Sequence, residues 1–472
     1  MRRRVRKQQN GLRLHGFDSN TKPIPATNAN AIVRIMPTTA DAAVIAPSAR
    51  AGGHVTVPGD KSISHRYALL AAVAEGVTTI RGYSDGWDTR TTLSCLRTLG
   101  VSIDWEPDRV TIAGRGFDGL TCPPIALDAA NSGTTMRLLA GIVAGRPFRT
   151  VISGDVSLRR RPMRRVIVPL TAMGARISSD EGRPPLVIEG APLHGITHTP
   201  EVPSAQVKSC VLIAGLHAVG TTTVTETTPT RDHTERALET FGARVERRAN
   251  SVTVEGGQRL HSANVEVPGD ISGAAFWSAL AAGTPGGDIT VEGVGLNPTR
   301  TRLFAILERA GARVTATLAE TTAPEPAGTL RVQSHDYRDF TIEPADVPGV
   351  IDEIPALAAL AAMMPAGRKL TVRGARELRV KESDRISALA AGFRAMGSDV
   401  DEYDDGFVLT ARPLHGAEVY AVHDHRLAMA FAIAATRASA PVTIHGASAA
   451  AVSYPAFFEA LSRLTRGPSA RP

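Results

Sequence analysis

Basic and hydroxyl side chains gather where a predicted strand ends and a helix is expected to begin, in the segment VPGDKSISHR at residues 57–66. The side chains there that could do chemistry are Lys61, Ser62, Ser64 and Arg66. Backbone N–H groups, the helix dipole and nearby cations favour a bound anion at such a position. A turn with a capping serine is the more ordinary interpretation of this segment taken alone.

Small and basic residues occur at two further expected helix starts. DAANSGTTMRLLAG, beginning at Asp128, contains Asn131 and Gly133, and its small residues allow a ligand to approach the backbone. GDVSLRRRPM, beginning at Gly154, places Arg161 in a run of three arginines, which suit bidentate contacts with phosphate or carboxylate. A simple helix cap and a solvated surface patch are the alternative interpretations.

Polar residues in four later segments could complete an anion site, although each segment taken alone more often means a helix cap or a solvated surface charge. They are Ser204, Gln206, Lys208, Arg231, Lys381, Glu382, Arg385, Asp424, His425 and Arg426. His423 and His425 lack a third ligand at a metal-binding spacing, so a metal site is not expected.

Two carboxylates, Asp352 and Glu353, stand at the entry of a nearly all-apolar stretch that reads as a buried helix, residues 354–364. Charge at such a place is costly unless it is paired or used. Together with the cations above, these residues predict a site that binds phosphates and carboxylates and leaves Asp352 and Glu382 for proton transfer.

A repeated unit is expected to position these segments. Helix-like stripes end at a glycine typical of a C-cap, and two segments that alternate polar and apolar residues follow, as in half-buried strands. The glycines are Gly100, Gly174, Gly242, Gly311 and Gly397. A sixth helix-like stripe covers residues 457–464, and a lone strand covers 52–59. The N-terminal strand is therefore expected to belong with the C-terminal units, which gives two groups of three.

The turn sequence VPGD occurs at residues 57–60 and again at 267–270, where the chain is expected to cross between the groups. Two crossings at one place make a hinge, and ligands commonly bind in the cleft between hinged domains. The predicted division is a disordered basic extension at 1–45, one domain of 46–60 plus 269–466, a second domain of 61–268, and a tail at 467–472.

Composition excludes several classes of protein. Residues 1–35 carry eight of the 53 Lys and Arg but one of the 46 Asp and Glu, so the net charge of +7 belongs to this segment and the rest is neutral. A nucleic-acid-binding body is therefore not expected. Three cysteines exclude a disulfide framework, and no apolar run is long enough to span a bilayer.

The motifs PGDKSISHR, NSGTTMRL, RPM, SAQVKS, TRDHTE, RVKESDR and HDHRLAMAF, in this order, resemble those of the 5-enolpyruvylshikimate-3-phosphate synthases, a group within the enolpyruvyl transferase family. The resemblance runs from about residue 51 to 464. It implies a two-domain inside-out α/β fold of six βαβαββ units, with pseudo-threefold symmetry in each domain. It also implies a cytoplasmic monomer without metal or organic cofactor, and without nucleic-acid or membrane partners.

The implied reaction condenses phosphoenolpyruvate with the 5-hydroxyl of shikimate 3-phosphate and releases phosphate, on the pathway to chorismate and the aromatic amino acids. Glyphosate would compete with phosphoenolpyruvate. Implied catalytic residues are Asp352, Glu382 and Lys61. Implied contacts of shikimate 3-phosphate are Lys61, Ser62, Arg66, Ser204, Ala205, Gln206, Arg231, Asp352 and Lys381. Implied contacts of phosphoenolpyruvate are Lys61, Asn131, Gly133, Arg161, Gln206, Arg385, His425 and Arg426.

One departure and two rival functions accompany the resemblance. Many members of the group carry a lysine near the C-terminus, whereas residues 451–455 read AVSYP here. UDP-N-acetylglucosamine enolpyruvyl transferase shares the fold and chemistry but uses a loop cysteine, and none of Cys95, Cys122 and Cys210 reads as one. A non-catalytic protein that binds a phosphorylated ligand is the other alternative, which Asp352 and Glu382 disfavour.

Overall fold

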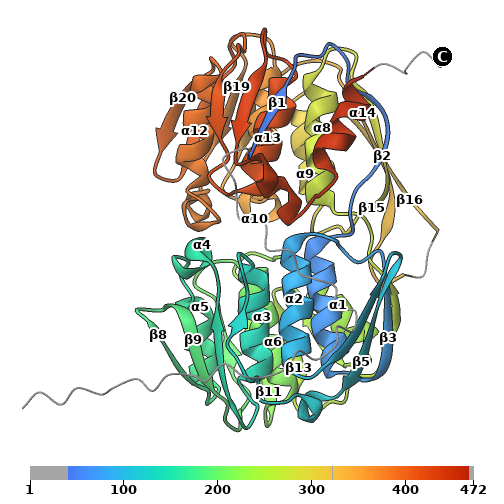
Figure 1. Cartoon of the computed structure of the whole chain (residues 1–472), viewed down its shortest axis with the longest axis vertical. Helices are drawn as coiled ribbons and strands as arrows, with labels where there is room; N and C mark the ends of the chain where they lie inside the picture. Colours follow the sequence, from blue (N-terminus) through green and yellow to red (C-terminus); the bar gives the residue numbers. More distant parts are fainter. Residues whose placement is uncertain (1–40, 321–322, 467–472) are drawn as a thin grey trace, which may run out of the picture. The chain divides into compact units, whose positions relative to one another are not determined.

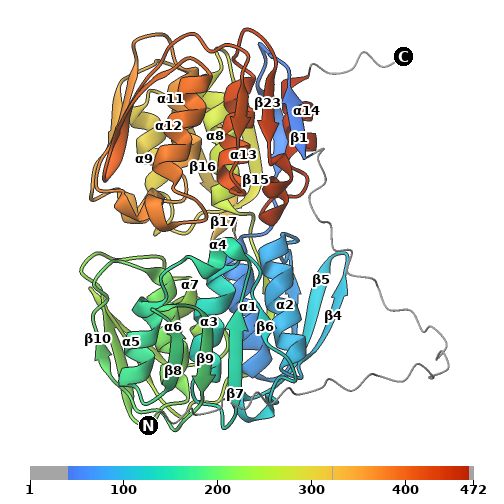
Figure 2. The ribbon, with the colours of Figure 1, turned by 60° about the vertical axis from the view of Figure 1, so that its left-hand side comes forward.

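A computed structural model describes residues 41–320 and 323–466 as a mixed α/β protein, drawn in Figures 1 and 2. Residues from Asp41 onward form one compact unit. Among the described residues, no helix combines the length and the apolar character needed to cross a bilayer. The same residues contain no group of three or more His, Cys, Asp or Glu placed to hold a metal ion.

Within the described residues, five four-stranded sheets share one order: a parallel pair of strands is extended by two antiparallel partners. Three are β14(Asn264–Glu266)-β3(Glu75–Arg81)-β5(Arg109–Arg115)-β4(Ser102–Glu106), β6(Leu127–Asp128)-β7(Arg149–Ser153)-β9(Arg183–Glu189)-β8(Arg176–Asp180) and β10(Thr197–His198)-β11(Thr221–Thr225)-β13(Ser251–Glu255)-β12(Val245–Arg248). Two are β2(Gly52–Thr56)-β15(Asp288–Gly295)-β17(Ala327–Gln333)-β16(Arg313–Leu318) and β18(Phe340–Ile342)-β19(Lys369–Val372)-β21(Gly406–Thr410)-β20(Asp399–Tyr403). A three-stranded sheet has the order β1(Ala42–Ile45)-β23(Val442–His445)-β22(Glu418–Tyr420). The glycines predicted to end helices all have positive φ, as a C-cap requires.

Apolar helices fill two separate cores. The first is built around α1 (Lys61–Val73), α3 (Gly133–Val143) and α6 (Ala205–Leu216), and the second around α8 (Ile271–Gly283), α11 (Ile354–Met363) and α13 (His425–Ala435). The remaining helices are α2 (Trp87–Thr98), α4 (Val156–Arg159), α5 (Arg164–Ala172), α7 (His233–Thr240), α9 (Arg302–Arg309), α10 (Val347–Val350), α12 (Arg385–Ala395) and α14 (Phe457–Thr465), with 3-10 turns η1 (Phe117–Gly119), η2 (Arg376–Val380) and η3 (Ala447–Val452).

One hydrophobic core joins residues from Ile63 to Val267, and the other joins Ala51 and Val55 to residues 271–464. We call the parts built around these cores the first lobe and the second lobe. Figures 1 and 2 both draw the blue strand β1 among the red and orange elements of the second lobe. The exact domain boundaries expected from the sequence stay a prediction.

The two VPGD turns lie against each other where the chain passes between the lobes. The amide of Asp60 donates to the carbonyl of Pro268 at 2.7 Å, and the amide of Asp270 donates to that of Pro58 at 2.8 Å. Each aspartate side chain then caps the next helix, because Asp60 accepts from the amide of Ile63 and Asp270 from that of Ser272. The crossings therefore fix the starts of α1 and α8 together.

The prediction of a disordered extension over residues 1–45 is wrong for residues 42–45. Residues 1–40 of that extension lie outside the described part of the chain. Residues 42–45 form β1, which pairs antiparallel with residues 442–445. Four small apolar residues carry little periodic signal on their own, and their partner strand lies far away in the chain. Pairing with that distant edge, rather than local propensity, makes this segment a strand.

We expect Gly392→Ala to lower the free energy of unfolding by about 1–3 kcal/mol, as overpacked cores do. The new Cβ would lie 2.2 Å from the ring of Phe431, which itself packs edge-on against Phe393. This contact joins α12 to α13, whose first residues carry site charges. Gly273→Ala, in the first turn of α8, is the control, because the nearest neighbour of its new Cβ lies at 3.6 Å. Alanine should be neutral there or add up to ~1 kcal/mol. Denaturant titration of both variants measures the difference, and equal stabilities would contradict the packing argument.

Candidate active site

A cavity of about 330 Å³ lies between the two lobes and is lined by residues from both. Most of the residues expected from the sequence contribute to its wall. They are Lys61, Ser62, Gly133, Arg161, Ser204, Ala205, Gln206, Arg231, Asp352, Lys381, Glu382 and Arg426. The volume falls in the range of small-ligand pockets. Residues spread over most of the chain are thus brought to one chamber.

Helix starts of the first lobe supply much of this wall. Lys61, Gly133 and Ala205 are the first residues of α1, α3 and α6. Ser132 and Ser204 cap α3 and α6 by accepting from amides in the first turn. These starts therefore point free N–H groups and positive dipole ends toward the cavity, which favours anionic ligands.

Asp352 is surrounded by cations. Arg231 donates to its carboxylate, and Lys381 Nζ and Arg385 Nη1 lie 3.4 Å and 3.7 Å from Oδ1. Arg426 donates to its backbone carbonyl at 2.6 Å. Burial alone would raise the pKa of Asp352, but Lys381 and Arg231 hold that pKa well below its usual value. The side chain is therefore a carboxylate at neutral pH.

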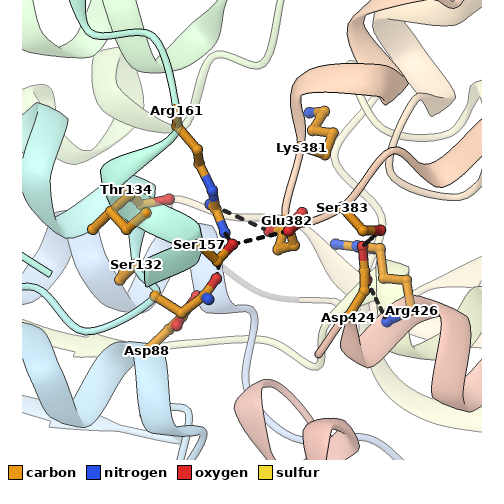
Figure 3. A network of polar contacts seen from close by, with 12 residues as sticks. Asp88, Ser132, Thr134, Ser157, Arg161, Lys381, Glu382, Ser383, Asp424 and Arg426 are labelled. Carbon is orange, nitrogen blue, oxygen red and sulfur yellow. Dashed lines mark hydrogen bonds and ion pairs between the residues drawn. The ribbon is translucent and has the colours of Figure 1, made fainter. Parts of the chain in front are cut away.

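Glu382 also has polar partners beside it, among them Arg161 and Ser157 (Figure 3). Arg385 Nη2 donates to Oε2 at 2.6 Å, and Arg161 Nη1 lies 3.7 Å from Oε1. Burial would raise the pKa of Glu382, but Arg385 and Arg161 hold it well below the usual value. Ser157 of the first lobe also donates to the backbone carbonyl of Glu382 at 2.9 Å. Contacts at this residue thus join the two lobes.

Asp424, capping α13, holds the arginines beside these carboxylates. Its carboxylate accepts from Arg385 Nε at 2.8 Å, from the hydroxyl of Ser383 at 3.0 Å and from the amide of Arg426 at 3.0 Å. Figure 3 shows Asp424 between Ser383 and Arg426, next to Glu382. Arg385 is fully buried, and its ion pairs with Asp424 and Glu382 offset the cost of that burial.

Four residues expected at the ligands lie outside the cavity lining. Arg66 is buried and donates to Ser62 and two hydroxyls, and Asn131 accepts from Arg161 and donates to Asp155. The other two are Arg385 and His425. They support lining residues from behind, and their direct contact with substrates stays a prediction.

His425 differs from the other supporting residues because neither ring nitrogen has a hydrogen-bond partner in the described part of the chain. The side chain is 1% exposed. Burial, and then the charges of Lys61 and Arg426, lower the pKa of His425 well below its usual value. A neutral imidazole with free donor and acceptor atoms therefore stands beside Glu382.

Sequence reasoning missed four charged residues in the cavity wall, Asp88, Arg137, Arg165 and Glu377, and it assigned a fifth, Asp270, only to a turn between the lobes. Lys61 Nζ donates to Asp88 Oδ2 at 3.1 Å. Burial, and then Arg165 and Arg161, lower the pKa of Arg137 to about 9. Arg137 follows Gly133 by one helical turn, so the helix period could have pointed to it. Nothing local in the sequence marks the others.

Comparisons with known proteins give a consistent picture. A model of the EPSP synthase family, described as 3-phosphoshikimate 1-carboxyvinyltransferase, matches residues 45–461. A protein of that name from Halorhodospira halophila is 49% identical over 427 residues, 90% of this chain and 96% of the relative. One from Acidithiobacillus ferrooxidans is 48% identical over 416 residues, 88% of this chain and 95% of the relative. The solved EPSP synthase of Acinetobacter baumannii has a TM-score of 0.78 at 43% identity, over 89% of this chain and 98% of that one.

Arg165 and Glu377 should couple energetically across the lobes. Two parallel bonds of 3.0 Å join them in a bidentate pair, with each side chain about a third exposed. Replacing each residue by Gln, singly and together, should give a coupling free energy of about 0.5–1.5 kcal/mol in denaturant unfolding. The same cycle on the exposed pair Arg248 and Glu246 is the control and should give close to zero. Equal coupling free energies in the two cycles would contradict the expected stabilisation by the pair of Arg165 and Glu377.

Proposed function

The chain belongs to the EPSP synthase family, and we propose on this premise that it transfers the enolpyruvyl group of phosphoenolpyruvate to the 5-hydroxyl of shikimate 3-phosphate. The products are 5-enolpyruvylshikimate 3-phosphate and inorganic phosphate, at a step of the shikimate pathway toward chorismate and the aromatic amino acids. The observation that carries the proposal is the meeting of cations from many segments with Asp352 and Glu382 in one cavity. Measuring phosphate release by purified protein with the two substrates tests it directly.

The rival activities fit less well. None of the three cysteines lines the described cavity, and Cys95 and Cys210 are buried, so a loop cysteine acting as an acid has no counterpart here. The family match and the relatives' name also favour the shikimate enzyme over the UDP-N-acetylglucosamine enolpyruvyl transferase. In a passive binding protein, two carboxylates in the cavity wall would weaken the binding of an anionic ligand, which disfavours that alternative.

Shikimate 3-phosphate would occupy the part of the cavity beside the starts of α1 and α6. Lys61, Ser62, Arg231 and the Ser204–Gln206 turn offer cations, hydroxyls and N–H groups to the phosphate and ring. Asp352 and Lys381 face them from the second lobe. Arg66 would act indirectly, since it already donates to the carbonyl of Ser62 at 2.8 Å.

Phosphoenolpyruvate would lie beside the start of α3. Gly133 and Arg161 from the first lobe and Arg426 from the second line this part, with Lys61 and Gln206 between the substrates. Asn131, Arg385 and His425 would support it from behind. No lysine is present at residues 451–455. Arg426 would meet the carboxylate of phosphoenolpyruvate, and the buried Arg385 behind it would add positive charge.

The chemistry would proceed by addition and elimination. Asp352 takes the proton of the 5-hydroxyl as its oxygen attacks C2, and C3 receives a proton, for which Glu382 is the proposed donor. In the tetrahedral intermediate the C2–O bond to phosphate then breaks, C3 returns a proton to the Glu382 carboxylate and the double bond re-forms. The leaving phosphate takes up the proton that Asp352 accepted. Lys61 and the arginines stabilise the charge on the phosphate that leaves. Protons and electrons balance without a metal or organic cofactor.

The remaining expectations concern the setting of the enzyme. We propose a cytoplasmic monomer that binds its two small substrates and neither nucleic acid nor membrane. The neutral balance of charge outside residues 1–35 supports this.

Asp352→Asn and Glu382→Gln should each lower kcat about 10²–10⁴-fold, because each removes a group that transfers a proton. Binding of shikimate 3-phosphate should survive in both variants and can be measured by calorimetry. Asp404→Asn, at an exposed carboxylate on the turn between β20 and β21, is the matched control and should keep full activity. Unchanged kcat in both site variants would remove their assigned roles.

Gly133→Ala should raise KM for phosphoenolpyruvate about tenfold, or ~1.4 kcal/mol, and KM for shikimate 3-phosphate less. The new Cβ would lie 2.8 Å from Arg137 Nη1 and 3.3 Å from Arg161 Nη1, so both guanidinium groups must shift. Glyphosate should compete with phosphoenolpyruvate in the parent protein and inhibit this variant more weakly. Steady-state kinetics with each substrate varied in turn checks both effects, and unaltered inhibition would mean that Gly133 is wrongly placed.

A further inference from the structure

The loop between β16 and β17 carries a buried carboxylate from the second lobe to the first. Glu325 is 2% exposed, and both of its oxygens are engaged. His233 Nδ1, at the start of α7 in the first lobe, lies 2.7 Å from Oε1. Asn297 donates to Oε2 at 2.9 Å. One glutamate thus joins elements of both lobes outside the cavity.

The same contacts hold the segment that leads into α7. Asn297 donates at 2.7 Å to Asp232, whose other oxygen accepts from Arg236 at 2.8 Å. Arg236 also donates to the carbonyl of Pro324, the neighbour of Glu325, at 2.9 Å. Asp232 and His233 are therefore fixed from two sides by the loop that carries Glu325 and by Asn297.

Arg231 immediately precedes these two fixed residues and is the one whose side chain turns into the cavity. Its guanidinium donates to Asp352 and lies 3.4 Å from the hydroxyl of Ser62. On its other side Thr230 donates to the buried Glu226. The backbone around Arg231 is therefore clamped, and the clamp on its C-terminal side depends on Glu325.

Burial of an ionisable group gives a reason to look for a function here. Buried charge pairs seldom add net stability compared with apolar residues of the same size. Such a contact is more readily explained when it fixes a geometry that the reaction needs, since a displacement of 1 Å at a binding group can be costly.

We propose that Glu325 is a positioning residue for the transfer reaction: through His233 and Asp232 it holds Arg231 where the phosphate of shikimate 3-phosphate binds. This inference rests on the proposed function. Glu325 touches neither substrate, and its effect passes through Arg231 alone. It follows that Glu325 governs the affinity for shikimate 3-phosphate and leaves phosphoenolpyruvate largely unaffected.

Glu325→Gln tests the proposal, because it keeps the shape of the side chain and removes its charge. KM for shikimate 3-phosphate should rise about five- to tenfold, with KM for phosphoenolpyruvate within about twofold of the parent. His233→Gln alters the other end of the contact and should give the same split. Glu320→Gln, an exposed glutamate of the same loop, is the control and should change neither constant. An equal rise in both constants, or none, would overturn the proposal.

A double-mutant cycle with Arg231→Gln separates positioning from a general structural role. In the Arg231→Gln background, Glu325→Gln should change KM for shikimate 3-phosphate by less than about twofold. If the increases in KM caused by the two substitutions multiply in the double variant, Glu325 acts independently of Arg231. Calorimetry can measure the affinity of the parent and of Glu325→Gln for shikimate 3-phosphate. This measurement separates a failure of the positioning role from a failure of the proposed function. Equal affinities overturn the positioning role, whereas binding without phosphate release overturns the proposed function only.

Discussion

The site depends on mutual neutralisation of buried charges. Arg385 is fully buried, and Arg161 and Arg426 nearly so. Removing such cations from water would be prohibitive without anions close by. Asp352, Glu382 and Asp424 supply these anions. Several cations can therefore be buried close together in a small volume. The proposed function uses two of these carboxylates, Asp352 and Glu382, for proton transfer, so the groups that offset the buried cations would also take part in the reaction.

The fold makes this concentration of charge possible by separating apolar helix bodies from polar helix ends. The bodies of α11 and α13 are buried throughout, whereas charged residues stand where these helices begin. In the first lobe the starts of α1, α3 and α6 face the same cavity with capped first turns. Each lobe thus has its own hydrophobic core, and the charged residues of the site lie where the lobes meet.

Motifs at helix starts allowed much of the site to be predicted, because a cap, a glycine and a cation within a few residues have a local physical meaning. Lys61, Gly133 and Arg161 are examples, and each lines the cavity. Contacts between segments that are distant in the sequence have no comparable local pattern. Asp88 meets Lys61 27 positions earlier, and Arg165 meets Glu377 212 positions later. No local pattern encodes such pairings.

The sequence could also not separate residues that line the cavity from those behind it. Arg66 belongs to the same motif as Lys61, yet it points into the first lobe and donates to Thr234 and Ser209. The direction of a side chain depends on its helix's rotation against neighbours, which packing decides. Strand β1 was missed for a related reason, since its partner lies 400 residues away in the chain and its own four residues carry little signal.

The low pKa of both carboxylates has a consequence for the order of events. Arg385 and Arg161 hold the pKa of Glu382 well below its usual value, so its carboxyl group is ionised at neutral pH. An arriving anion adds negative charge beside Glu382 and draws these arginines toward itself, and both effects raise its pKa. The same reasoning applies to Asp352 when a phosphate engages Arg231, which makes the carboxylate a stronger base. Substrate binding would thus raise the pKa of both carboxyl groups toward the range that the proposed acid and base require.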